Sequence, residues 1–376
     1  MGSAPDWSRL GEYQAQLTAS DFRWLLESQY APNGANEGWV TVERDRALVL
    51  RFEDDAEPYE IEFREYGRLP APPPRYWRTR DEWRATKPDD ALPLAGLKVA
   101  LDPGHIGGEF AAMEFRSWKT SDGPLFREGE FVLEVSKVLK PQLEALGATV
   151  YLVRETNEPV TTDTPESLRP LAAKLVTERE LTPGLELDVK DRELKEKSLA
   201  RLLFYRVSEI KARAQLVNEQ FQPDVTLCLH VDGTTTPEDK ELADQGYAHF
   251  LVNGAYSADE LSYDDQRYAM IERLLSGTWQ VERPLADTMA VCFREISPQP
   301  PFTYTGPNAV RINPNPYVWA RNLMANRLYQ CPTIFLEPFV ANEVGFYSDY
   351  QENPEQLAQT YARAVELALV RFYAAP

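Results

Sequence analysis

The hydrophobic positions along the chain follow two different patterns, one on each side of about residue 94. Before it, WVTVERDRALVLRFEDD and PYEIEFREY alternate apolar and polar residues, which is typical of half-buried antiparallel strands. TASDFRWLLESQY has apolar residues at helical spacing, and LPAPPPRYW is a stiff, proline-rich connector. We therefore predict a small α+β domain with a proline-rich linker over residues 1–93.

After residue 94, short apolar runs alternate with longer amphipathic segments. KVALD, ATVYLV, DVTLCLHV, GYAHFLV and PTIFLEP are rich in β-branched residues, and helix-like segments separate them. This alternation is typical of parallel strands joined by crossover helices. We predict an α/β fold over residues 94–376, with a mostly parallel, twisted sheet flanked by helices. Two charged or proline-rich stretches, at about 155–196 and 233–330, are interpreted as insertions.

Composition narrows the classes of partner. The 376 residues carry a formal net charge of -19, which argues against non-specific binding to nucleic acid or to anionic lipid. No apolar run reaches about 20 residues, so we predict no transmembrane segment. The start, MGSAPDW, lacks the basic and apolar regions of a signal peptide. The three cysteines form no metal-like spacing and are expected to be buried hydrophobic residues.

Chemically active residues gather at the predicted strand ends. KVALD is followed by PGH with His105, VTLCLH ends in His230, and TIFLE ends in Glu337. Glu128, in FREGEFVLEV, stands just before the helix-like segment EFVLEVSKVLK. Ligands in α/β folds bind where strands end at their carboxyl edge, so we expect these residues to meet there.

Two histidines and two carboxylates suit zinc catalysis. Three of them, His105, Glu128 and His230, could hold the ion and leave a position open for water. The ion would lower the pKa of that water and polarise a carbonyl group. The fourth residue, Glu337, could then take the proton from water and pass it to the leaving nitrogen.

Several residues keep two interpretations at this point. Glu130 competes with Glu128, although it would point to a different helical face, and Glu128 is favoured. Asp102 either orients His105 or holds the tight turn through backbone amides. His249 is interpreted as a structural residue, with substrate contact as the alternative. The late aromatic residues either form a sugar-stacking platform or pack their own segment: Phe302, Tyr304, Tyr317 and Trp319.

The motifs together, in this order, resemble those of the zinc-dependent N-acetylmuramoyl-L-alanine amidases of the amidase_3 family. DPGH matches that family's first zinc histidine and carries it onto His105. The family's ligand glutamate, five residues before a leucine, fits Glu128, and the LCLHVDG segment puts the third ligand on His230. FLEPFVANE resembles the family's catalytic segment and carries the catalytic glutamate onto Glu337.

Two further positions follow from the same resemblance. An arginine five residues before an asparagine is matched by Arg213 and Asn218, and the asparagine after the catalytic glutamate is matched by Asn342. We expect Arg213, Asn342 and Asp102 to support the site or to contact substrate. There are departures: Asp232, Val132 and Pro338 stand where the family usually has other residues.

The resemblance implies a sheet of about six strands, bound Zn²⁺ and cleavage of the amide between N-acetylmuramic acid and L-alanine. It also implies that the partner is peptidoglycan or its muropeptides and that the protein is periplasmic or secreted. Two alternatives remain at this stage. One is a zinc peptidase or amidohydrolase on another amide, and the other is a non-catalytic wall-binding protein on an amidase scaffold.

Overall fold

The computed structural model describes residues 4–70, 74–88, 91–120, 123–180, 189–234 and 242–375. Its centre is a seven-stranded sheet in the order β10-β11-β9-β12-β8-β4-β7. The strands are β4 Lys98–Pro103, β7 Thr149–Leu152, β8 Val225–Leu229, β9 His249–Val252, β10 Val310–Arg311, β11 Val318–Ala320 and β12 Thr333–Glu337. β7, β4, β8 and β12 are parallel neighbours, whereas β9 pairs antiparallel with β12. The predicted α/β class with a mostly parallel sheet is confirmed.

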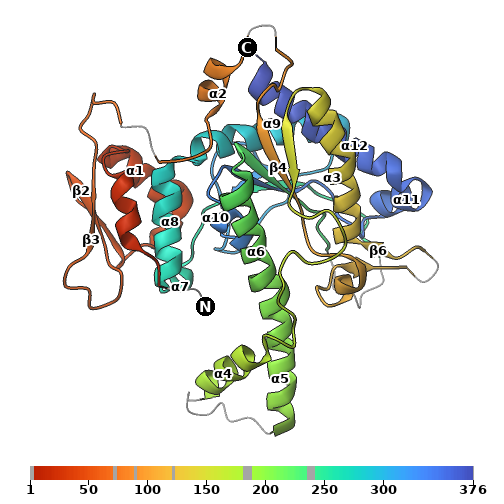
Figure 1. Ribbon diagram of the computed structural model, residues 1–376, viewed down its shortest axis with the longest axis horizontal. Helices are drawn as coiled ribbons and strands as arrows, with labels where there is room; N and C mark the ends of the chain where they lie inside the picture. Colours follow the sequence, from red (N-terminus) through yellow and green to blue (C-terminus); the bar gives the residue numbers. More distant parts are fainter. Residues whose placement is uncertain are drawn as a thin grey trace.

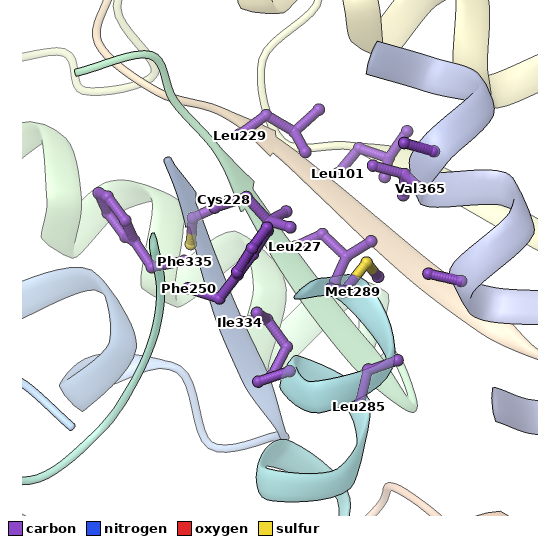
Figure 2. Close-up of a cluster of buried hydrophobic side chains, with 14 of the residues drawn as sticks. Leu101, Leu227, Cys228, Leu229, Phe250, Leu285, Met289, Ile334, Phe335 and Val365 are labelled. Carbon is purple, nitrogen blue, oxygen red and sulfur yellow. The ribbon is translucent and has the colours of Figure 1, made fainter. Parts of the chain in front are cut away.

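Three long helices cover one face of the sheet (Figure 1). They are α3 Glu128–Ala145, α9 Trp279–Ile296 and α12 Pro354–Leu369. The last begins as its sequence predicts: the Asn353 side chain accepts a hydrogen bond from the backbone of Gln356, and Pro354 occupies the first helical position. Figure 2 shows the core beneath, where Leu101, Leu227 and Ile334 of the sheet lie near Met289 and Val365 of these helices.

Cys228, Cys292 and Cys331 are free and buried, as predicted.

Shorter elements lie around this body. They include β5 Ser117–Trp118, β6 Phe126–Arg127, α6 Glu209–Gln215, α10 Met324–Leu328 and α11 Val344–Glu352. None of the helices in the described ranges has both the length and the apolar character that crossing a membrane requires.

The stretch at 155–196 holds a helical hairpin that projects from the body (Figure 1). It consists of α4 Arg169–Glu180 and α5 Val189–Leu202, and the latter leads through a π-helical segment, Leu203–Ser208, into α6. The two arms have their own small core, in which Ala172, Ala200 and Leu203 are buried.

The stretch at 233–330 contributes directly to the main body. It supplies β9, β10, β11 and α9, and so three of the seven strands. It also supplies α7 Ala258–Leu261 and α8 Asp264–Ser276. The sequence pattern predicted β9 in GYAHFLV but not β10 and β11, which are short and adjoin proline-rich segments.

The N-terminal part packs on that same stretch. It contains α1 Ala19–Leu25, a three-stranded antiparallel sheet of β1 Val40–Val42, β2 Arg46–Val49 and β3 Tyr59–Glu62, and later α2 Arg80–Thr86. Phe22, Leu25 and Ile61 share one buried cluster with Met270 and Leu274 of α8. Figure 1 shows α1 and α8 side by side. The division at residue 93 stays a prediction, and the two sides share a core.

Candidate metal centre

The turn after β4 positions His105. Gly104 follows the strand directly, and a Cβ atom there would lie 2.1 Å from Cε1 of His230. Only glycine therefore lets the two segments approach so closely. His105 itself has a φ of 56°, a left-handed conformation that histidine adopts more readily than most residues.

Arg213 holds this turn in place from α6. Its guanidinium donates hydrogen bonds to Asp102 Oδ1 and to the carbonyls of Pro103 and His105, at 2.8, 2.8 and 2.7 Å. Its Nε also donates to Glu209 at 2.7 Å. Such a fork of donors is specific to arginine. The resemblance therefore placed Arg213 next to the site, where it fixes the backbone that carries His105.

Asp102 supports the turn through side chains. It accepts hydrogen bonds from Arg213 and from the hydroxyl of Tyr329. The ring of His105 faces Glu114 instead, with 3.3 Å between Nδ1 and Oε1. Of the two interpretations of Asp102, the structure favours the turn, although the bonds run to side chains.

His105, Glu128 and His230 converge at the carboxyl edge of the sheet. Each offers one ligand atom, and these atoms lie within 4.8 Å of one another. Glu128 opens α3, and its Oε1 is 2.9 Å from His230 Nδ1, while its Oε2 is 3.3 Å from His105 Nε2. Glu130, the competing carboxylate, pairs with Arg127 at 3.0 Å.

The chemistry of these three side chains fits a divalent cation. Burial lowers the pKa of His230, which keeps its imidazole neutral with a free lone pair. Burial alone would raise the pKa of Glu128, but the adjacent histidines and Arg116 lower it to about 2, so the carboxylate is ionised. Two neutral imidazoles and one carboxylate form a known zinc ligand set.

Three residues beside the centre were not found as candidates from the sequence. Glu114 contacts His105 and accepts the amide of Ile106 at 2.9 Å. Arg116 donates to His105 Nε2 at 3.1 Å and lies 3.4 Å from Glu128 Oε2. Asp232 was noticed only as a departure from a family pattern. Glu114 and Arg116 lie in the loop after DPGH, which inspection of strand ends does not reach.

Glu337 ends β12 and lines the same cavity as both histidines, a space of about 420 Å³. Its Oε2 is buried and has no hydrogen-bond partner among the described residues. Burial raises the pKa of Glu337 well above its ordinary value, and the nearby carboxylates of Asp232 and Glu128 add to this effect. These surroundings favour the protonated form of the carboxyl group.

The remaining candidates lie around this core. Asn342 exchanges hydrogen bonds with Thr234 at 3.0 and 2.9 Å and so fixes the segment that follows His230. His249 also lines the cavity. Phe302 and Tyr304 pack against the His249 ring, with centroids 5.1 and 5.5 Å away, and are absent from the cavity wall. This placement supports packing over a sugar platform for these two residues.

Comparison with known proteins gives one relative by sequence. No family model matches the chain. The probable cell wall amidase LytH of Staphylococcus saprophyticus is 36% identical over 87 residues, which is 23% of this chain. The chain therefore spans only 28% of the length of that relative.

Among solved structures, the apo form of the N-acetylmuramyl-L-alanine amidase Ami1 from Mycobacterium abscessus is 16% identical, with a TM-score of 0.41. The match covers 74% of this chain and 99% of that one. The CwlD amidase of Clostridioides difficile, solved with the GerS lipoprotein, is 11% identical over 74% of this chain and 98% of its own, with a TM-score of 0.40. At these identities and TM-scores the structural similarity is distant. The chain is thus similar over one segment to a probable cell wall amidase, and both of these structural neighbours are amidases.

Proposed function

We propose that this protein is a zinc-dependent hydrolase that cleaves the amide between N-acetylmuramic acid and L-alanine in peptidoglycan. The observation that carries the proposal is the joint placement of His105, Glu128 and His230, with Glu337 lining the same cavity. The sequence similarity to a cell wall amidase supports the choice of substrate. Because peptidoglycan lies outside the inner membrane, the proposal includes a periplasmic or secreted location.

Zinc would be held by His105, Glu128 and His230, and when bound it would supply a Lewis acid for the carbonyl and for the attacking water. Arg213 and Asp102 keep His105 in position through the backbone of the turn. Glu114 faces the other nitrogen of the His105 ring and fixes its orientation.

Glu337 would move the proton. In hydrolysis, the hydroxyl of water joins the carbonyl carbon, the carbon–nitrogen bond breaks, and a proton must reach the departing nitrogen. The unpartnered Oε2 of Glu337 is free to accept the proton from water. Because burial favours the neutral carboxyl, Glu337 holds that proton until the nitrogen accepts it.

A digest of purified muropeptides, followed by mass spectrometry, tests this function. We expect the zinc-loaded protein to release free stem peptide. Glu337→Ala should bind zinc normally but lose activity by about 10²- to 10⁴-fold, the usual contribution of a general acid–base group. Glu130→Ala, which removes a carboxylate from the same region, is the matched control and should retain activity.

Other outcomes have distinct meanings. Activity of Glu337→Ala close to that of the wild type would remove Glu337 from the mechanism. Cleavage at a different amide would support a peptidase or another amidohydrolase. Failure of the zinc-loaded protein to cleave any amide would contradict the proposed function.

A further inference from the structure

Two arginines that form no ion pair with a described residue line the cavity that Glu337 also lines. Arg206 lies in the π-helical segment before α6, Arg321 follows β11, and both line the cavity together with His249. These three residues come from separate parts of the chain. None of them belongs to the metal-binding set.

Neither arginine forms an ion pair within the described parts of the chain, although the protein carries a net charge of -19. Arg321 is close enough to Glu337 for its charge to favour the ionised carboxylate. Arg206 lies over the ring of Tyr205, with 5.7 Å to the centroid. Arg321 donates one long hydrogen bond, 3.4 Å, to the hydroxyl of Tyr304. By contrast, Arg116 and Arg213, which also line the cavity, are both ion-paired. Two guanidinium groups therefore retain capacity for an anion.

His249 adds a buried hydrogen-bonding group to the same cavity. The residue is 2% exposed, and its Nδ1 has no partner within the described ranges. Burial and the charge of Arg321 lower the pKa of His249 to about 3, so the ring is neutral at physiological pH. A buried polar atom without a partner is destabilising, and the one on His249 is available to a group bound in the cavity.

His249 is also close to the proposed proton carrier. It is the direct register partner of Glu337 across the β9–β12 pair, and directly opposed residues have Cβ atoms about 5 Å apart. Phe302 and Tyr304 pack against its ring and fix its position. A ligand group bound here would therefore lie on the β9 side of the site.

We propose that Arg206, Arg321 and His249 form a subsite that binds a carboxylate of the substrate's peptide. The inference rests on the proposed function and adds an orientation, with the stem peptide on the β9 side of Glu337. A carboxylate is the ligand group expected near Arg206 and Arg321, because guanidinium groups bind carboxylates through paired hydrogen bonds. An uncharged sugar hydroxyl would not form such paired, charged hydrogen bonds.

Binding of a free stem peptide tests the subsite without requiring catalysis. We would titrate the zinc-loaded, full-length protein calorimetrically with a stem peptide bearing free carboxylates, and with the same peptide converted to carboxamides. The wild type should bind the carboxylate form at least about tenfold more tightly. Arg206→Gln and Arg321→Gln should each weaken binding of that form about tenfold, since each removes a charged hydrogen bond, and should leave the carboxamide form unaffected.

Arg201→Gln is the matched control, because Arg201 is an exposed arginine on α5 that does not line the cavity. It should bind both peptides as the wild type does. Arg206 is exposed, so its substitution is compatible with folding even if Arg321→Gln proves unstable.

Equal binding of the two peptides by the wild type would overturn the subsite. So would unchanged carboxylate preference in Arg206→Gln. A preference for the carboxylate peptide that both variants lose, in a protein that cleaves no muropeptide, would retain the subsite while contradicting the proposed function.

Discussion

At the scale of single residues, the site depends on close approach between segments that are far apart in sequence. The clearest case is Gly104, which faces the ring of His230. A methyl group has no space there, and the neighbouring atoms belong to a proposed ligand. The glycine thereby couples the turn after β4 to the end of β8.

Replacing Gly104 by alanine should therefore displace His230. We expect zinc affinity to fall at least tenfold and the free energy of unfolding to fall by about 1–3 kcal/mol, as in other overpacked interiors. Chelator competition and urea unfolding measure the two effects. Gly11→Ala is the control, since a Cβ at Gly11 meets no atom within 4 Å. Wild-type zinc affinity in Gly104→Ala would show that the ring of His230 can move without loss.

His249 links stability to pH. Burial and Arg321 lower its pKa to about 3 in the folded protein, against about 6.5 in an unfolded chain. Between these values the unfolded state binds more protons, so the stabilisation is fully present above about pH 6.5 and is lost as the pH falls. His249→Phe should lack this dependence.

The test compares urea unfolding of the wild type and His249→Phe between pH 6 and pH 4, with a chelator present. The free energy of unfolding of the wild type should decrease more steeply, by up to about 1.4 kcal/mol per pH unit. Parallel curves for the two proteins would mean that His249 does not remain neutral in the folded state.

At the scale of elements, the predicted order of strands and helices was enough to expect which side chains meet at the carboxyl edge of the sheet. Parallel strands end at one edge, and this rule was sufficient to expect His105, His230 and Glu337 together. The rule did not identify Glu114 and Arg116, because their loop has no periodic pattern and its path depends on packing against the rest of the molecule. Nor did it separate the two roles of Asp102, which depend on the positions of Arg213 and Tyr329.

The hairpin of α4 and α5 behaves as a separate element. It has its own buried cluster, and none of the described residues between 155 and 196, which exclude 181–188, lines the cavity. The cavity is lined instead by residues that follow α5 in the chain, in the segment Leu203–Ser208 and in α6, beginning at Tyr205.

Replacing residues 176–196 by a short glycine–serine turn should therefore leave the body folded. We expect the zinc content and the rate of muropeptide cleavage to stay within about twofold of the wild type. Metal analysis and the cleavage assay measure these quantities, and circular dichroism shows the loss of helix. A marked rise in the cleavage rate would instead show that the hairpin restrains activity.

At the scale of the whole molecule, the N-terminal part and the sheet domain are joined through α8. The sequence suggested separate domains because the alternating pattern stops at a proline-rich run. Burial of Phe22 and Ile61 with Met270 is a long-range contact, which local periodicity does not encode. For the same reason, the stretch at 233–330 was interpreted as an insertion, although it supplies β10 and β11 to the sheet besides the predicted β9.

The whole molecule is also acidic, whereas the cavity is lined by two arginines, Arg206 and Arg321, that form no ion pair in the described parts of the chain. The net charge of the sequence does not predict these arginines in the cavity, because their position depends on which side chains the fold brings together. The same holds for the proposed metal centre, whose residues lie between positions 105 and 230 of the sequence and meet within 4.8 Å.

The most direct test of the account is the zinc content of the full-length protein after equilibration with limiting zinc, measured by native mass spectrometry. The account predicts one zinc ion per chain in the wild type and in Glu337→Ala, and loss of that ion in His105→Ala, in Glu128→Ala and in His230→Ala. A wild type that binds no zinc, or ligand variants that retain it fully, would contradict the central claim.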